Sequence, residues 1–370
     1  MSRPRPRDLG IITGTLRTGN WNAITDVPGV RVGYATVIQD TPKVVRTGVT
    51  AIWPCESPNW ATPVFAGAHS FNGNGEVTGM AWIAEQGLLT APICITNTNC
   101  VGTVRDAVCK LAVRSGAPQL WHLPVTGETC DGFLSDPSAF VVTEETAFAA
   151  LETAVSGPLA EGNVGGGTGM ICYEFKGGNG TASRKIDINV DRARPAGTAE
   201  ETASAARTYT VGVFVQANCG RRPQLTIAGV PVGKEIPGSV YKEEAGSIII
   251  VVATDAPLLA NQLKRLARRS SLGLARTGSI SGNGSGDLFI AFSTANPNVA
   301  SADQITHSVQ TIPNDLMDPI FSGVVQATDE AIVNALVDNQ SMTGANNHRV
   351  ESLPHDRLRE ILKKYDRISQ

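Results

Sequence analysis

The stretch GSIIIVVATDAPLL, residues 246–259, decides the class of fold expected for this 370-residue chain. Six consecutive apolar residues, 248–253, follow Ser247 without interruption, as in a strand that is covered on both faces. The next residues start a helix, with Asp255 expected as its cap and Pro257 in its first turn. A buried strand that runs directly into a helix is typical of α/β proteins.

Hydrophobic periodicity over the rest of the chain predicts the same class. Short apolar runs between turn-forming residues indicate strands in ITDVPGVRVGYATV (24–37), TGVTAIWP (47–54), APICITNTNC (91–100) and DLFIAFST (287–294). Helical spacing appears in TVRDAVCKLAVRSG (103–116), TEETAFAALETA (143–154), VVQATDEAIVNALV (324–337) and HDRLREILKKYDRI (355–368). We expect many strands in the first half and helices set against strands in the second.

The composition excludes partners that are recruited by charge. The chain is 42% hydrophobic and 18% charged with a net charge of -3, so nothing favours nucleic acid or an anionic membrane surface. The longest apolar run is about six residues, against roughly 18 for a membrane span. The first ten residues contain no apolar signal region, and we therefore expect a cytoplasmic protein without a membrane partner.

Neither the cysteines nor the glycines indicate a metal or a cofactor. The seven cysteines are scattered and form no C-x-x-C pair, which argues against a disulfide framework and a zinc site. The glycine-rich EGNVGGGTGM (161–170) fits no phosphate-binding pattern, and we interpret it as a loop where backbone segments approach closely. We expect no metal and no organic cofactor.

Ser247 lies at the boundary between an acidic, polar run and the buried strand. A serine hydroxyl needs a neighbouring base to act as a nucleophile, and the α-amino group of an N-terminal serine can be that base. Such a serine requires a cut after Gly246, and Ser247 can make it by attacking the preceding carbonyl, where glycine adds no Cβ to hinder the geometry. Taken alone, a Gly-Ser pair before a strand is usually a turn.

Two further polar clusters end or begin a strand. Ser285 and Asp287 stand among glycines in SGNGSGDLFIAF, where a hydroxyl and a carboxylate can relay a proton for the nucleophile or its amine. Asn218 follows a strand in VQANCG, and its amide can donate to an oxyanion. Residues of these types are also common in ordinary turns at the ends of strands. No G-x-S-x-G sequence supports a Ser-His alternative.

Taken together, the motifs resemble the L-aminopeptidase/D-esterase family, which includes β-peptidyl aminopeptidases and has nylon-oligomer hydrolases as relatives. The resemblance covers nearly the whole chain. The motifs that carry it, in chain order, are ITDVPGVRVGYAT, PVFAGAHSFNGNGEVTGMAWI, ITNTNCVGTVRDAV, ETCDGFLSD, GNVGGGTGM, VGVFVQANCG, GSIIIVVATDAPL, SGNGSGDLFIAFSTAN and MTG.

The resemblance implies a single hydrolase domain over residues 1–370 that cuts itself between Gly246 and Ser247, giving an α chain of 1–246 and a β chain of 247–370. It implies a four-layer α/β/β/α sandwich, similar to Ntn-hydrolases but differently connected, and a homotetramer of αβ units. Ser247 would be the nucleophile and Glu128 would hold the ammonium group of the substrate. The supporting roles would fall to Ser285, Asp287 and Asn218.

Two positions depart from the family as we know it. Cys130 stands where an aromatic residue such as tyrosine is common, and Asn99 where histidine is common. Because cysteine is shorter than tyrosine and a weaker donor, Cys130 affects the expected substrate range and rate. We expect it to line or underlie the substrate pocket.

The expected activity is removal of an N-terminal residue from short peptides, amides or esters that carry a free amine, through an acyl-enzyme on Ser247. Two alternatives stay open at this point. One is an amidase that acts on non-peptide oligomers, and the other is an unprocessed, inactive homologue that serves as a structural or binding oligomer.

Overall fold

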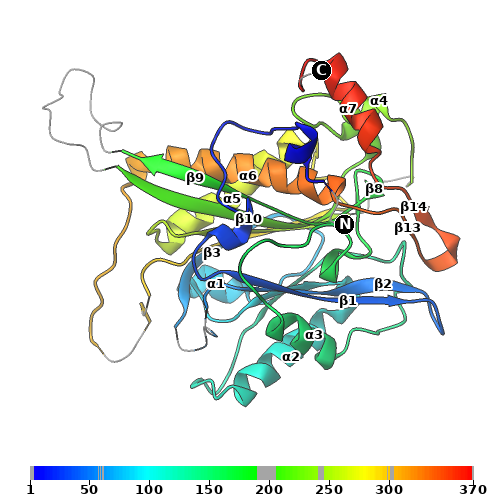
Figure 1. Cartoon of the computed structure of the whole chain (residues 1–370). Coiled ribbons are helices and arrows are strands. Elements are labelled where there is room, and N and C mark those ends of the chain that lie inside the picture. The colour runs from blue at the N-terminus through cyan, green and yellow to red at the C-terminus, as the bar shows by residue number, and fades with distance from the viewer. Residues whose placement is uncertain are drawn as a thin grey trace, which may run out of the picture.

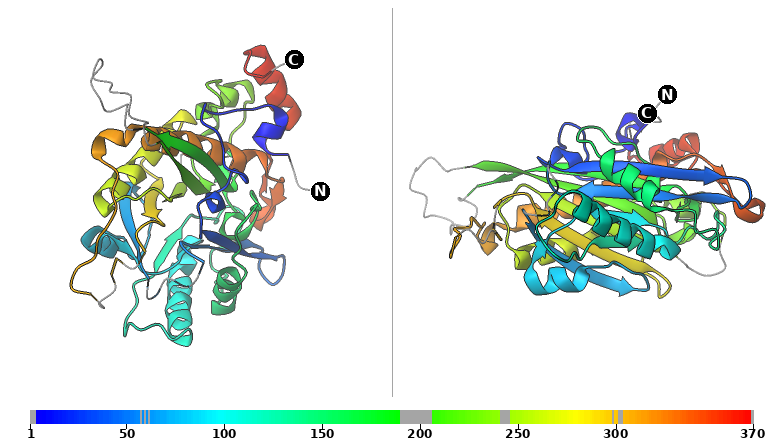
Figure 2. Two further views of the ribbon diagram at one scale, coloured as in Figure 1. Left: turned by 60° about the vertical axis from the view of Figure 1, so that its left-hand side comes forward. Right: turned by 90° about the horizontal axis from the view of Figure 1, so that it is seen from below.

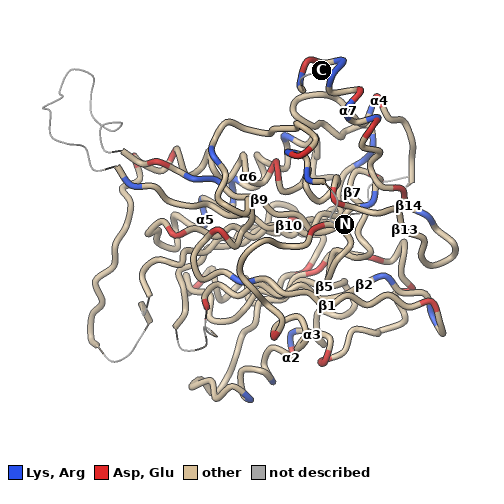
Figure 3. The backbone as a smooth tube through the Cα atoms, viewed as in Figure 1, with Lys and Arg blue, Asp and Glu red and all other residues tan. Residues whose placement is uncertain are grey.

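The computed structural model describes residues 4–56, 58, 60, 62–189, 206–240, 246–297, 299–300 and 304–368. Two β-sheets lie face to face in the middle of the molecule, with helices on both outer sides (Figure 1). Two further views show the same layering from other directions (Figure 2). Lys and Arg are interspersed with Asp and Glu along the described chain (Figure 3).

The larger sheet has six strands in the order β4-β3-β12-β11-β10-β9. Its members are β3 (Val64–Gly73), β4 (Leu88–Leu89), β9 (Gly178–Ile188), β10 (Arg207–Asn218), β11 (Ser247–Thr254) and β12 (Gly286–Ser293). All neighbours are antiparallel except β11 and β12, which are parallel. The first residues of β11 and β12 therefore lie beside the last residue of β10, at the same end of these three neighbouring strands.

The smaller sheet has four strands in the order β1-β2-β5-β6, of which β5 and β6 are parallel. They are β1 (Arg31–Gln39), β2 (Val45–Trp53), β5 (Ile93–Thr96) and β6 (Val125–Glu128). Two short hairpins pair β7 (Ile171–Cys172) with β8 (Phe175–Lys176) and β13 (Met342–Thr343) with β14 (Arg349–Val350).

Two pairs of helices cover the outer faces of the sheets. Helices α5 (Ala260–Arg276) and α6 (Asp318–Val337) pack on the larger sheet, and α2 (Val101–Arg114) and α3 (Glu144–Glu152) pack on the smaller one. The shorter helices are α1 (Met80–Gln86), α4 (Val232–Glu235) and α7 (His355–Lys364). Three apolar clusters fill the three interfaces: helix on larger sheet, sheet on sheet, and smaller sheet on helix. The expected four-layer α/β/β/α sandwich is confirmed.

Strand β11 belongs to two of these cores at once, and every one of its residues is buried. Successive side chains of a strand point to opposite faces. The first set packs under the helices and consists of Ile248, Ile250 and Val252. The second set packs between the sheets and consists of Ile249, Val251 and Ala253. The prediction of a strand covered on both faces is confirmed.

The predicted start of the helix after β11 is wrong. Helix α5 begins at Ala260, and Asp255 does not cap it. The Asp255 carboxylate instead accepts a hydrogen bond from the main-chain N–H of Thr210 in β10, at 2.6 Å. The Gln262 side chain accepts from the N–H of Leu259 at 3.0 Å, which is the cap-like contact at the true start. A long-range contact to the neighbouring strand therefore outweighed the local capping preference.

Helix α6 differs from the amphipathic helix predicted over 324–337, because it is buried on almost every side. It is long and apolar enough to cross a membrane by length and composition, but 89% of that window is buried inside the protein. Its carboxylate Glu330 is paired internally: Glu330 is 1% exposed and pairs with Arg7 and Arg184. The helix is therefore a core helix.

Candidate active site

The predicted catalytic residues converge where β10 ends and β11 and β12 begin. Ser247, the first residue of β11, lies directly opposite Asn218, the last residue of β10. On its other side Ser247 lies opposite Gly286, the first residue of β12. Directly opposed residues of neighbouring strands point to the same face, so the Ser247 and Asn218 side chains both face the smaller sheet.

The carbonyl oxygen of the peptide bond between Gly246 and Ser247 accepts two hydrogen bonds. The Ser247 hydroxyl donates to the Gly246 carbonyl oxygen at 2.7 Å, and the N–H of Gly286 donates to the same oxygen at 3.1 Å. A Cβ added at position 246 would overlap the main-chain carbonyl of Asn218, which explains why glycine stands there. The acidic, polar run before Gly246 includes residues 241–245, which lie outside the described residues.

Asn218 is fixed by hydrogen bonds at both ends of its amide. Its Oδ1 accepts from the N–H of Ile171 at 2.7 Å, and its Nδ2 donates to the carbonyl of Cys130 at 3.0 Å. An amide nitrogen carries two hydrogens, so one is left for a further acceptor next to Ser247. This geometry suits the predicted role of Asn218 as an oxyanion donor.

Ser285 and Asp287 form the predicted hydroxyl and carboxylate pair, but on the other face of the sheet. The Ser285 hydroxyl donates to Asp287 Oδ1 at 2.7 Å, and both residues are fully buried. Because they flank Gly286, which shares its face with Ser247, strand alternation turns both side chains toward the helices. The pair therefore lies on the face of the sheet opposite to the Ser247 hydroxyl.

Burial raises the pKa of the Asp287 carboxyl, and the hydroxyls of Ser281 and Ser285 lower it in part. A carboxylate that gains a proton more readily than usual is suited to proton exchange with a nearby amine. The environment of Asp287 therefore fits a role in setting the protonation of the amine at position 247.

A pocket of about 600 Å³ opens in front of Ser247. Its walls combine the predicted residues Gly246, Ser247, Glu128 and Cys130 with residues that the sequence did not single out. These are Asn74, Gly75, Glu76, Thr98, Gly132, Phe133 and Gly284. Asn218, Ser285 and Asp287 are buried and do not line this pocket.

Glu128, at the end of β6, presents a buried carboxylate to the pocket and is 3% exposed. Its Oε2 accepts from the Thr98 hydroxyl at 2.5 Å, and its Oε1 accepts from the N–H of Glu76 at 3.1 Å. Burial raises its pKa, while these two hydrogen bonds lower it in part. No cationic side chain of the described residues pairs with it, so an ammonium group from outside is its natural partner.

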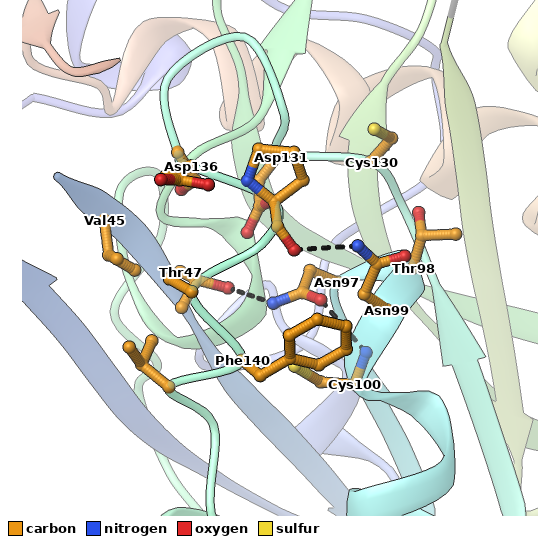
Figure 4. Close-up of a pocket in the computed structure, with 14 residues that line it drawn as sticks. Val45, Thr47, Asn97, Thr98, Asn99, Cys100, Cys130, Asp131, Asp136 and Phe140 are labelled. Carbon is orange, nitrogen blue, oxygen red and sulfur yellow. Dashed lines mark hydrogen bonds between the residues drawn. The ribbon is translucent and has the colours of Figure 1, made fainter. Parts of the chain in front are cut away.

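Cys130 is exposed and lines the pocket, as expected, whereas Asn99 does not. Desolvation raises the pKa of the Cys130 thiol, which keeps it protonated and a poor nucleophile at neutral pH. The Asn99 amide donates to the carbonyl of Pro137 at 2.8 Å and lines a second, neighbouring pocket (Figure 4). Of the two residues that depart from the family pattern, only Cys130 lines the pocket in front of Ser247.

Two asparagines without a predicted role hold the loop before β12 in place through hydrogen bonds. Asn72 donates to the carbonyl of Gly282 at 2.7 Å, and Asn74 donates to that of Gly284 at 2.8 Å. They secure the loop from which Ser285 projects. The alternating Asn and Gly of NGNG, residues 72–75, at the end of β3 are the signal that could have marked them. Thr98 carried no such signal.

Metal ligands do not cluster in the part of the chain that the structure describes: no group of three or more His, Cys, Asp or Glu residues there could hold an ion. The chemistry at this edge of the sheet is accordingly built from a hydroxyl, an amide, two carboxylates and main-chain groups. Such a set is suited to acyl transfer through a serine.

Comparisons with known proteins place this arrangement in a family. The model of peptidase family S58 matches residues 22–350. Beta-peptidyl aminopeptidase BapA of Sphingosinicella microcystinivorans is 46% identical, covering 99% of this chain and 93% of the relative. BapA of Sphingosinicella xenopeptidilytica is 42% identical, covering 98% of this chain and 92% of the relative.

Two solved structures are equally similar. A beta-aminopeptidase of Burkholderia sp. superposes with a TM-score of 0.87 at 44% identity, covering 98% of this chain and 99% of that one. The L-aminopeptidase D-Ala-esterase/amidase of Ochrobactrum anthropi, a serine aminopeptidase with a variant of the Ntn hydrolase fold, gives 0.88 at 43% identity, covering 99% and 100%. The resemblance found in the motifs is confirmed, and the chain belongs to peptidase family S58, with an Ntn-hydrolase type of fold.

Proposed function

We propose that this peptidase cuts its own chain between Gly246 and Ser247 and then uses Ser247 as an N-terminal nucleophile. Its substrates are short peptides, amides or esters with a free amine, from which it releases the N-terminal residue. The observation that carries the proposal is the geometry at Gly246: its carbonyl oxygen accepts both the Ser247 hydroxyl and the N–H of Gly286. The group to be attacked is thus polarised and next to its attacker.

In the first reaction the Ser247 oxygen attacks the Gly246 carbonyl carbon. The negative charge that develops on the carbonyl oxygen is stabilised by the N–H of Gly286. The bond from carbon to nitrogen then breaks, and the nitrogen takes up the proton that the hydroxyl loses and becomes the α-amine of Ser247. Water hydrolyses the resulting ester and leaves the chains 1–246 and 247–370.

In the second reaction the freed hydroxyl attacks the substrate. The Glu128 carboxylate holds the substrate ammonium in the pocket, the α-amine of Ser247 accepts the hydroxyl proton, and Asn218 Nδ2 donates to the developing oxyanion. Ser285 and Asp287, behind the sheet, set the protonation of that amine. The leaving amine or alcohol departs with a proton, and water then releases the acyl group from Ser247.

The substrate range rests on the pocket and on the relatives. The pocket of about 600 Å³ suits a short chain rather than a folded protein. Two relatives are named as beta-peptidyl aminopeptidases, and one solved structure is an aminopeptidase with D-Ala-esterase and amidase activity. We infer that β-linked and ordinary short peptides, together with simple amides and esters, are hydrolysed here.

The test compares the purified protein with Ser247→Ala on a denaturing gel and in an assay with aminoacyl p-nitroanilides. We expect two bands and hydrolysis for the unaltered protein, and one full-length band without hydrolysis for Ser247→Ala. Ser115→Ala, at an exposed serine outside the site, is the matched control and should behave as the unaltered protein. One uncut, inactive band from the unaltered protein after long incubation would overturn the proposal. An assay with ω-amino-acid oligomers in parallel separates the peptidase from an amidase on non-peptide oligomers.

From the family resemblance we also infer that the processed chains assemble as a homotetramer of αβ units in the cytoplasm. Light scattering on the purified protein checks the assembly, and fractionation of the producing cells checks the location. A monomeric αβ unit at micromolar concentration would contradict the first inference.

A further inference from the structure

A second, smaller pocket of about 130 Å³ adjoins the one in front of Ser247. The two share Thr98 and Cys130, which stand between them. In Figure 4 these two residues lie at one side of the small pocket, and the Asp131 carboxyl lies above Thr47 and Asn97 on its inner wall. The Asp131 carboxyl thus lines the pocket that adjoins the substrate pocket at Thr98 and Cys130.

Asp131 is buried without sufficient partners. It is 5% exposed, and its Oδ2 accepts no hydrogen bond from the described residues. Burial raises its pKa to about 6, against partial lowering by the Thr47 hydroxyl and the Asn97 amide. A buried carboxylate that lacks a partner is costly, which makes a cation in this pocket favourable.

The other polar groups on the wall are already engaged. The Asn97 amide donates to the Thr47 hydroxyl at 2.8 Å and accepts from the N–H of Cys100 at 3.1 Å. The Asn99 amide donates to the carbonyl of Pro137. The wall thus offers a cation the carboxylate of Asp131, whereas a hard metal ion needs about six oxygen ligands. An organic ammonium group is the better fit.

We propose that this pocket is a subsite for a cationic side chain on the residue that the enzyme releases, with Asp131 as the partner of that charge. The inference rests on the proposed function, since it assumes that Glu128 holds the amine of the same residue. Thr98 connects the two positions, because its hydroxyl donates to Glu128 while it lines the small pocket. A volume of about 130 Å³ corresponds to roughly four water molecules, enough for a short aliphatic amine.

The other charged groups near Asp131 do not neutralise its carboxylate. Asp136 lines the same pocket, but its carboxylate accepts from Ser138 and pairs with Lys43 at 3.5 Å. Glu128, beyond the wall, adds negative charge that raises the pKa of Asp131 further. Desolvation raises the pKa values of the Cys100 and Cys130 thiols, which stay neutral. The pocket therefore becomes more favourable to a cation as the pH rises above about 6.

The experiment measures kcat/KM for the p-nitroanilides of lysine and of norleucine, which is nearly isosteric but lacks the charge. We expect the unaltered enzyme to favour lysine by about tenfold or more. Asp131→Asn should reduce this preference to about threefold or less and leave the norleucine rate within about twofold. Asp136→Asn is the matched control and should keep the preference.

A second readout does not depend on any variant. In the unaltered enzyme the ratio of lysine to norleucine rates should fall as the pH is lowered through about 6, since Asp131 takes up a proton there. Efficient hydrolysis of norleucine with no preference for lysine at any pH would overturn the subsite and leave the proposed function standing. Failure to hydrolyse either substrate would overturn the proposed function and the subsite with it.

Discussion

Two buried glutamates in this molecule have opposite surroundings. Glu330 in α6 accepts from Arg7 at 2.6 and 2.7 Å and from Arg184 at 2.6 Å. Burial alone would raise its pKa, but the two arginines outweigh burial and hold the pKa below its ordinary value. Among the described residues, Glu128 accepts from one hydroxyl and one main-chain N–H, and burial leaves its pKa raised.

The difference separates a structural carboxylate from a binding one. The chain itself supplies the cations for Glu330, so that charge holds the N-terminal segment and β9 against α6. The described residues supply none for Glu128, which faces an open pocket beside Ser247. A buried carboxylate whose cation must come from outside is a candidate binding site for an amine.

The largest effect that we expect is on stability, at the Glu330 cluster. Glu330→Gln leaves Arg184 buried without its carboxylate, and we expect a loss of about 3–5 kcal/mol in the free energy of unfolding. Urea unfolding checks it. The control is Glu351→Gln, whose ion pair with Arg349 is exposed and should contribute less than about 1 kcal/mol. Equal losses in the free energy of unfolding for Glu330→Gln and Glu351→Gln would contradict the structural role of the buried Glu330.

The corresponding substitution in the candidate site, Glu128→Gln, should weaken substrate binding without destabilising the fold. Glu128→Gln removes the charge that holds the substrate ammonium, and we expect KM for an aminoacyl p-nitroanilide to rise by roughly 30-fold, or about 2 kcal/mol. Stability should stay within about 1 kcal/mol, because a neutral amide is buried at lower cost than a carboxylate.

The matched control for this change is Glu85→Gln, at an exposed glutamate of α1 outside the pocket. We expect less than about a threefold change in KM for it, as for an exposed charge. A Glu128→Gln enzyme with unchanged KM would remove Glu128 from amine recognition.

The two carboxylates should also differ in their response to pH. The pKa of Glu128 is raised, so KM should increase as the pH falls through a value above the ordinary range of glutamate, by up to about the 30-fold of Glu128→Gln. The stability contributed by Glu330, whose pKa is lowered, is present above its ordinary pKa and is lost only as the pH falls through the lowered value. Profiles of KM and of urea unfolding against pH measure both, and Glu128→Gln should flatten the first profile alone.

The smallest effect that we expect comes from the support of Glu128. Thr98→Val removes the hydroxyl that lowers the pKa of Glu128, so the carboxylate should be protonated at a higher pH. The expected loss is about 1 kcal/mol, or roughly fivefold in KM at neutral pH. Thr98→Ser restores the hydroxyl and should restore KM. If both variants behave alike, packing rather than the hydrogen bond explains the effect.

Much of the fold could be predicted from the sequence, because its signals are local. The apolar run 248–253 indicates a strand buried on both faces, and β11 belongs to two cores. The helix predicted within 143–154 is present as α3, and Thr143 caps it by accepting from the N–H of Thr146 at 3.4 Å. The start of α5 could not be predicted, since the carboxylate of Asp255 goes to Thr210, a residue far away in the sequence.

The candidate site was predictable in its members but not in its arrangement. The Gly246-Ser247 pair and the clusters at Asn218 and Ser285 all lie at strand ends, which the sequence pattern marks. Which face each side chain occupies depends on register, and register is set by pairing between distant strands. The sequence therefore could not show that the Ser285 and Asp287 side chains face the helices. It also could not show that Thr98 donates a hydrogen bond to Glu128.

The central claim is that Ser247 is both a new chain terminus and the nucleophile. The most direct measurement is mass spectrometry of the purified protein after brief exposure to a slowly hydrolysed aminoacyl ester, with sequencing of the N-terminal peptide of the smaller chain. The account predicts a chain that begins at Ser247 and carries the acyl group on that residue. A single uncut chain, or an acyl group on another residue such as Cys130, would contradict it.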